Sequence, residues 1–80
     1  MTRVAVVTGG TRGIGKAISV GLKNAGYKVA ANYAGNDEAA AKFSKATGIG
    51  VYKFDVSDVD ACQRGVKQVE AELGPIDIVV

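Results

Sequence analysis

Histidine is absent from this 80-residue sequence, and cysteine occurs once, as Cys62. Without histidine or a second thiol, a zinc site lacks its usual ligands, so we expect no metal centre. The single cysteine also excludes an internal disulfide. Because it falls on the apolar side of a helical pattern, Cys62 is expected to be a small core residue rather than a nucleophile.

An excess of charge of one sign is also lacking. Ten basic and eight acidic residues are scattered along the chain, for a net charge of +2. Such a distribution contains neither a basic stripe for nucleic acid nor a polybasic membrane anchor. The first apolar run, Val4–Val7, has four residues and is too short for a signal segment or a membrane span. We therefore expect a cytoplasmic protein with no nucleic-acid or membrane partner.

The sequence does contain an alternation of short apolar runs and amphipathic segments. Predicted strands are Val4–Val7, Val29–Tyr33, Val51–Phe54 and Ile76–Val80, and predicted helices run from Ile14 to about Ala25, from about Asp37 to Thr47, and from about Val59 to Leu73. This β-α-β-α-β-α-β order predicts an α/β fold, a Rossmann-like doubly wound parallel sheet with the fourth strand beside the first.

Each predicted helix has an expected inner face or cap. The first helix should have Ser19 on its polar side and should bury Ile14, Ala17, Ile18, Gly21, Leu22 and Ala25. The second helix should start at Asn36 or Asp37 and end at Gly48. The third helix should follow a cap formed by Ser57 and Asp60, and should bury Val59, Cys62, Val66, Val69 and Leu73. No linker divides these elements. Because the last strand lies at the predicted ligand site, we expect residues 1–80 to be the N-terminal part of a single domain, truncated in strand four.

A glycine-rich turn, Thr8-Gly9-Gly10-Thr11-Arg12-Gly13-Ile14-Gly15, joins the first strand to the first helix. Glycine accepts positive φ and lets a ligand approach the backbone, and a helix start directs unpaired N–H groups at an anion. The turn therefore predicts a phosphate site. A P-loop is the competing interpretation, but Ala17 stands where its magnesium-binding Ser or Thr should be. A turn that only packs the helix on the strand is a second alternative.

This octet resembles the cofactor motif of the short-chain dehydrogenase/reductase family. Asp55-Val56 and Pro75–Val80 are similar to later segments of that family. Within it, the chain most resembles acetoacetyl-CoA reductases of polyhydroxybutyrate synthesis, with 3-oxoacyl-acyl-carrier-protein reductases as close relatives. The resemblance implies NADP-dependent reduction of a 3-oxoacyl thioester, an acyl-CoA substrate and a homotetramer. A nucleotide-binding module without catalysis is the alternative from another class.

The predicted cofactor-binding residues come from the glycine turn and from the ends of the second and third strands. They are Gly9, Thr11, Arg12, Gly13, Ile14, Gly15, Tyr33, Asp55 and Val56. Gly9 and Gly13 should admit the pyrophosphate, and Gly15 should let the helix pack on the strand. By the resemblance, the Ile14 N–H donates to phosphate, the Asp55 carboxylate accepts from the adenine amino group, and the Val56 backbone meets the ring. Capping of the following helix is the competing role for Asp55.

Cofactor preference is predicted from Arg12 and from the residue that ends the second strand. NAD-binding folds place a carboxylate about 20 residues beyond the glycines, where this chain has Tyr33. A guanidinium pairs with phosphate in a bidentate way, so Arg12 suits the 2′-phosphate of NADP; a solvated surface arginine is the alternative. We therefore predict NADPH over NADH.

No catalytic residue is predicted in this chain. The family uses a Ser, a Tyr-x-x-x-Lys pair and an Asn, all expected beyond Val80. Tyr27, Tyr33 and Tyr52 do not replace that tyrosine, because the residue four positions after each is not a lysine.

Overall fold

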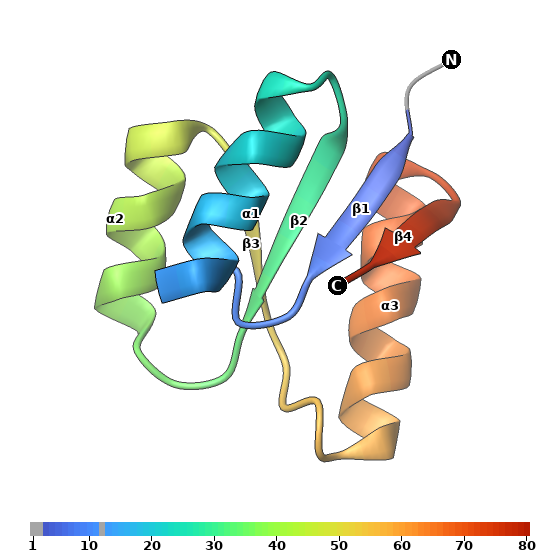
Figure 1. Cartoon of the computed structure of the whole chain (residues 1–80). Helices are drawn as coiled ribbons and strands as arrows, with labels where there is room; N and C mark the ends of the chain where they lie inside the picture. Colours follow the sequence, from blue (N-terminus) through green and yellow to red (C-terminus); the bar gives the residue numbers. More distant parts are fainter. Residues whose placement is uncertain (1–2, 12) are drawn as a thin grey trace.

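A computed structural model describes residues 3–11 and 13–80 of the chain, and strands and helices alternate along it (Figure 1). The elements are β1 (Val4–Val7), α1 (Gly13–Asn24), β2 (Lys28–Tyr33), α2 (Asp37–Thr47), β3 (Gly50–Lys53), α3 (Val59–Leu73) and β4 (Ile76–Val79). No helix within the described ranges has the length and apolarity needed to cross a membrane.

The strands form one sheet in the order β3-β2-β1-β4, and every neighbouring pair is parallel. The chain thus starts in the middle of the sheet, builds outward through β2 and β3, and returns through α3 to the other side of β1. This reversal confirms the predicted Rossmann-like topology, with β4 beside β1. The backbone N–H and hydroxyl of Thr8 donate to the Val80 carbonyl at 2.9 and 2.7 Å, which ties the end of β1 to the end of β4.

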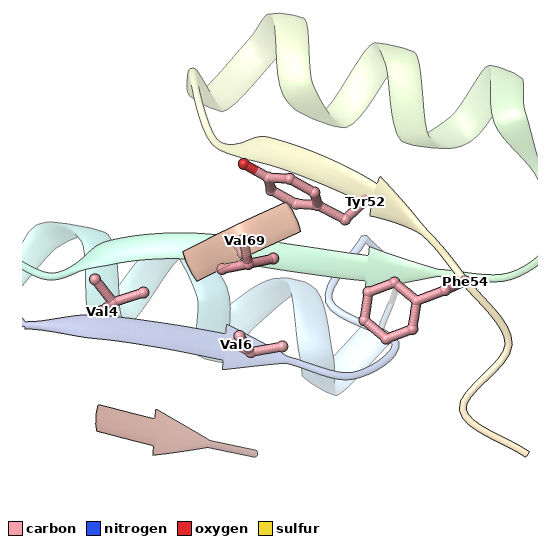
Figure 2. Close-up of a cluster of buried hydrophobic side chains, with 6 residues drawn as sticks. Val4, Val6, Tyr52, Phe54 and Val69 are labelled. Atoms are coloured by element: carbon pink, nitrogen blue, oxygen red, sulfur yellow. The ribbon is translucent and has the colours of Figure 1, made fainter. Parts of the chain in front are cut away.

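Helices cover both faces of the sheet. On one face, Val4 and Val6 of β1 pack with Val69 of α3 (Figure 2). Tyr52 of β3 and Phe54, which follows β3, belong to the same cluster. On the opposite face, a second buried cluster joins strand residues to α1 and α2; it contains Val7, Val29, Ala31, Phe43 and Ile49. Because successive side chains of a strand point to opposite faces, a strand covered on both sides must be apolar throughout, as β1 is.

The caps of α2 agree with the sequence, whereas the cap of α3 differs. Asn36 caps α2 by accepting the Ala39 N–H at 3.0 Å, and Gly48 ends that helix in the left-handed conformation. For α3, the expected cap at Ser57 is wrong. Asp58 is the N-cap and accepts the Ala61 N–H at 3.1 Å, because the Ser57 hydroxyl is already bonded to Asp55.

The inner face of α1 is rotated from the predicted one. Ser19 is fully buried, and Ile14 is 81% exposed; Ala17, Gly21 and Ala25 are exposed as well. The buried or partly buried positions of α1 are Gly15, Ile18, Ser19, Val20 and Leu22; all but Val20 follow the three- and four-residue spacing of one helix face. A serine is tolerated inside because its hydroxyl bonds to backbone carbonyls, which offsets the loss of water.

On α3 the predicted stripe holds except at its first residue. Val59 is 69% exposed, so its assignment to the core is wrong. Val69 is fully buried, and Cys62, Val66 and Leu73 are partly buried. Gly65 is buried directly over Phe54: a Cβ at this glycine would lie closer than 3.0 Å to the Phe54 ring. The missing side chain therefore lets α3 pack close to the aromatic ring.

Candidate functional site

The carboxyl ends of β1, β2 and β3 lie at the same edge of the sheet (Figure 1). The glycine turn follows β1, and the segment from Ala34 to Asn36 follows β2. Together they line a hollow of about 190 Å³, whose walls are Gly9, Thr11, Tyr33, Ala34, Gly35 and Asn36. Ligands of open α/β sheets bind at this edge; the strand order reverses between β1 and β4, and the hollow lies next to that point, over the ends of β1 and β2. The structure thus brings together Gly9, Thr11 and Tyr33 of the predicted set.

The glycine turn combines two glycines of positive φ with the start of a helix. Gly9 and Gly13 have φ of 63° and 55°, and a Cβ at either position would meet nothing within 4 Å. Both are therefore left-handed and open to solvent. Helix α1 begins at Gly13, so the N–H groups of its first turn have no partner within the helix. The space beside these glycines can accept an anion.

Gly15 is needed for a different contact from the expected one. A Cβ there would lie closer than 3.0 Å to the Gly9 carbonyl group. The glycine therefore lets the first turn of α1 lie against the glycine turn itself rather than against β1. Any larger residue would push the open turn away from the helix start.

Two buried polar residues hold the glycine turn, and neither was predicted as part of the site. The Asn32 carbonyl accepts the Gly10 N–H at 3.0 Å, and its side-chain Nδ2 donates to the Phe54 carbonyl at 2.7 Å. The Ser19 hydroxyl lies 3.1 Å from the Gly10 carbonyl oxygen and 2.9 Å from that of Gly15. The available signal was a polar residue, Asn32, inside an otherwise apolar strand.

Asp55 and Val56 follow β3 and do not line the hollow. Asp55 Oδ1 accepts from the backbone N–H of Ser57 at 2.9 Å and from its hydroxyl at 2.7 Å. These two hydrogen bonds lower the pKa of the exposed Asp55 carboxyl. Val56 is 53% exposed. Asp55 therefore shapes the turn before α3, while both residues stay accessible to a ligand.

Of the other predicted residues, Thr11 is buried, with 6% exposed, and Ile14 is exposed at the start of α1. Arg12 lies outside the described residues.

Asp37 opens α2 as expected, but its carboxylate also accepts a hydrogen bond from the Tyr33 hydroxyl at 3.0 Å. The position that carries a carboxylate in NAD-binding folds holds Tyr33 here, but the start of α2 brings the Asp37 carboxylate back to the Tyr33 hydroxyl, a contact that the sequence did not predict.

A family model described as short chain dehydrogenase matches residues 3–80. The chain belongs to the short-chain dehydrogenase family. Members of this family bind a nicotinamide cofactor.

Known members of the short-chain dehydrogenase family match over the whole chain. It is 66% identical over 80 residues to an acetoacetyl-CoA reductase of Shinella zoogloeoides, and this match covers 100% of the chain and 33% of that protein. It is 39% identical over 85 residues to a 3-oxoacyl-acyl-carrier-protein reductase of Staphylococcus aureus, covering 100% of the chain and 35% of that protein. The chain thus spans about a third of the length of the relatives it matches.

A solved structure of the same family has the same arrangement of elements. A short-chain dehydrogenase/reductase from Serratia marcescens superposes with a TM-score of 0.89 at 35% identity, over 96% of this chain and 34% of that one. The arrangement of the strands and helices is therefore that of a solved short-chain dehydrogenase/reductase.

Proposed function

We propose that the protein carrying this chain reduces a 3-oxoacyl thioester, acetoacetyl-CoA, to the 3-hydroxyacyl thioester with NADPH, and that residues 1–80 form the N-terminal part of its single NADP-binding domain. The observation that carries the proposal is the 66% identity to an acetoacetyl-CoA reductase over all 80 residues. A 3-oxoacyl-acyl-carrier-protein reductase is the second candidate, supported by the lower identity of 39%.

The described residues suit the cofactor at its phosphates and at its adenosine end. The backbone of Gly9, Gly13 and Ile14 would hold the pyrophosphate at the start of α1. Thr11 and Tyr33 would border the adenosine, since they line the hollow. The nicotinamide supplies the hydride when the cofactor is bound. Gly15 and Asn32 act indirectly, by holding the turn in the shape that the phosphates need.

Asp55 and Val56 are proposed to meet the adenine ring outside the hollow, in the segment that follows β3. Asp55 Oδ1 is occupied by Ser57, and within the described part of the chain no hydrogen bond reaches its Oδ2. That second oxygen can accept from the adenine amino group while the turn stays intact. The two interpretations of Asp55, as a turn residue and as an adenine partner, are thus compatible.

The proposed preference for NADPH rests on Arg12 and on the neutral side chain of Tyr33. A charge-assisted hydrogen bond contributes about 1.5–3 kcal/mol, which is a preference of roughly 10- to 150-fold for the phosphorylated cofactor. In the complete protein, Arg12→Ala should weaken NADPH binding by about this factor and leave NADH binding nearly unchanged. Fluorescence titration with both cofactors measures this, with the exposed Arg64→Ala as a matched control. Equal weakening of both cofactors would contradict the assignment.

The substrate is tested with the complete protein and two thioesters. NADPH oxidation followed by absorbance should be faster with acetoacetyl-CoA than with the acetoacetyl form of acyl-carrier protein. The reverse order would favour the second candidate. NADPH binding without reduction of either thioester would favour a nucleotide-binding module.

The remaining proposals concern the whole protein. We propose a cytoplasmic enzyme of polyhydroxybutyrate synthesis that assembles as a homotetramer and needs neither nucleic acid nor membrane. The substrate class is supported by the similarity to an acetoacetyl-CoA reductase. The expected independence from nucleic acid and membrane is supported by the balanced charge of the chain. Light scattering of the complete protein would measure the subunit number.

A further inference from the structure

Three side chains form a charged network beside the hollow at the sheet edge. The Tyr33 hydroxyl donates to Asp37 Oδ1 at 3.0 Å, and Lys53 Nζ lies 3.2 Å from each oxygen of the same carboxylate. Tyr33 lines the hollow, and Asp37 directly follows another wall residue, Asn36. The network is therefore at the rim of the proposed adenosine site and not in a distant part of the surface.

The parallel pairing of β2 with β3 brings these residues together. Tyr33 is the register partner of Lys53, so the two side chains point to the same face of the sheet. Helix α2 covers this face and starts with Asp37, just after the loop that leaves β2 (Figure 1). The lysine thus reaches the carboxylate from the last residue of β3, although 16 residues separate them in sequence.

The charge of the Asp37 carboxylate is unfavourable for the binding of a phosphorylated cofactor. A phosphate monoester carries nearly two negative charges at neutral pH, and a carboxylate at the rim of its site repels it. The Lys53 hydrogen bond, followed by that of Tyr33, lowers the pKa of Asp37, so this carboxylate is ionised at neutral pH. Its charge must therefore be balanced if a 2′-phosphate is to enter the hollow.

We infer that Lys53 is a specificity-determining residue for the phosphorylated cofactor, because it pairs with Asp37 and so removes the repulsion between this carboxylate and a 2′-phosphate beside Tyr33. The inference rests on the proposed use of NADPH. Lys53 acts through Asp37 and is distinct from the turn residues that would hold the pyrophosphate. NADH has no 2′-phosphate, so its binding should not depend on this pair.

A purely structural role for Lys53 makes a different forecast. If the ion pair only holds the start of α2, its loss should affect stability, or both cofactors alike. Both side chains are more than half exposed, at 53% for Lys53 and 66% for Asp37, and exposed pairs contribute little to stability. Cofactor discrimination therefore separates the two roles.

The test uses four variants of the complete protein and direct binding measurements. Lys53→Met removes the charge, Lys53→Arg keeps it, and Lys53→Met with Asp37→Asn removes both partners. Lys42→Met is the matched control, because Lys42 also pairs with a carboxylate of α2, Glu38, at 3.6 Å and is 78% exposed. NADPH and NADH are titrated by fluorescence, and 2′,5′-ADP and 5′-AMP by calorimetry, with thermal melting to check folding.

Lys53→Met should raise the Kd of NADPH and of 2′,5′-ADP about three- to tenfold, as expected for one unbalanced charge near a dianion. The Kd of NADH and of 5′-AMP should change less than about twofold. Lys53→Arg and Lys42→Met should bind as the unmodified protein does. The double variant should recover most of the lost NADPH affinity, since the repelling carboxylate is then neutral.

Equal effects on the two cofactors, or a double variant as weak as Lys53→Met, would overturn the inference. If the unmodified protein prefers NADPH and Lys53→Met is unchanged, the inference fails alone. If the unmodified protein binds neither cofactor, the proposed function fails, and the inference with it. A misfolded Lys53→Met still leaves Lys53→Arg and the double variant to decide, because a structural role predicts no recovery in the latter.

Discussion

At the residue scale, Asn32 connects three parts of the site. Its backbone carbonyl holds Gly10, its side chain holds the Phe54 carbonyl, and its Oδ1 lies 3.5 Å from the Gly9 N–H, a long contact. Asn32 is 4% exposed, so its polar atoms need these partners. The position of the glycine turn therefore depends on a residue of the neighbouring strand, and this dependence is invisible to a motif search.

A second residue-scale consequence concerns Asp55 and its pKa. Because Ser57 donates to the carboxylate through its hydroxyl and its backbone N–H, the pKa of Asp55 is lowered in the folded protein. A lowered folded pKa means that the stabilisation is present at neutral pH and is lost as the pH falls through that value. Ser57→Ala removes the hydroxyl donor and should raise the pKa of Asp55 toward the ordinary value of about 3.9.

Carbon-detected NMR titration of the Asp55 carboxyl measures this change. Ser57→Thr keeps a hydroxyl and should leave the pKa low. A carboxyl that titrates identically in Ser57→Ala and in the unmodified protein would show that the hydroxyl does not support the turn.

At the element scale, two glycines inside helices have opposite surroundings. A Cβ at Gly65 of α3 would collide with the Phe54 ring, whereas a Cβ at Gly21 of α1 would meet nothing within 4 Å. Gly65→Ala should therefore destabilise the complete protein by about 1–3 kcal/mol through overpacking. Gly21→Ala should stabilise it by up to about 1 kcal/mol, because alanine is the better helix former.

Urea unfolding of both variants measures these opposite signs. The pair controls for the chemical change, since the substitution is the same in each helix. Stabilisation by Gly65→Ala would mean that Phe54 moves without cost and that the close packing of α3 is not required.

Also at this scale, α1 shows where sequence periodicity succeeds and where it fails. The helix itself was predicted, because apolar residues recur at three- and four-residue spacing. Its inner face was wrong, since Ile14 is exposed and Ser19 is buried. Hydrophobicity orders residues by their average behaviour, and the Ser19 position is decided instead by two carbonyl groups, those of Gly10 and Gly15, in a turn that the helix contacts.

At the scale of the whole molecule, cofactor binding should be coupled to folding. A ligand that binds only the folded state stabilises it by about 2.7 kcal/mol at a free concentration of about 100 times Kd. NADPH should therefore raise the unfolding free energy of the complete protein more than NADH does at equal concentration. Gly15→Ala should abolish this increment, because a Cβ there collides with Gly9.

Urea unfolding with and without each cofactor gives the increment directly, independently of any loss of stability in the variant itself. Gly21 is exposed, lies outside the hollow and has nothing within 4 Å of the position its Cβ would take, so Gly21→Ala supplies the control. An undiminished increment in Gly15→Ala would show that the glycine turn does not hold the cofactor.

The topology of the molecule could be predicted from sequence, but many of the side-chain contacts in and around the site could not. The order of elements and the reversal at β1 follow from alternating periodicities and the handedness of crossovers. The role of Asp58 as the N-cap of α3 was missed, since Ser57, Asp58 and Asp60 all have side chains able to cap a helix. The link from Lys53 to Asp37 was missed because it depends on the register of two strands, and a single sequence contains no direct signal for register.

The contact between Gly65 and Phe54 has a consequence for engineering. Phe54 directly precedes Asp55, so the packing of α3 on the Phe54 ring also sets the position of Asp55 and Val56, the proposed adenine wall. A mutant library confined to the lining of the hollow would leave that wall where it is. Position 65 offers a handle outside the lining: graded substitutions there, paired with smaller residues at position 54, would shift the wall while every lining residue stays unchanged.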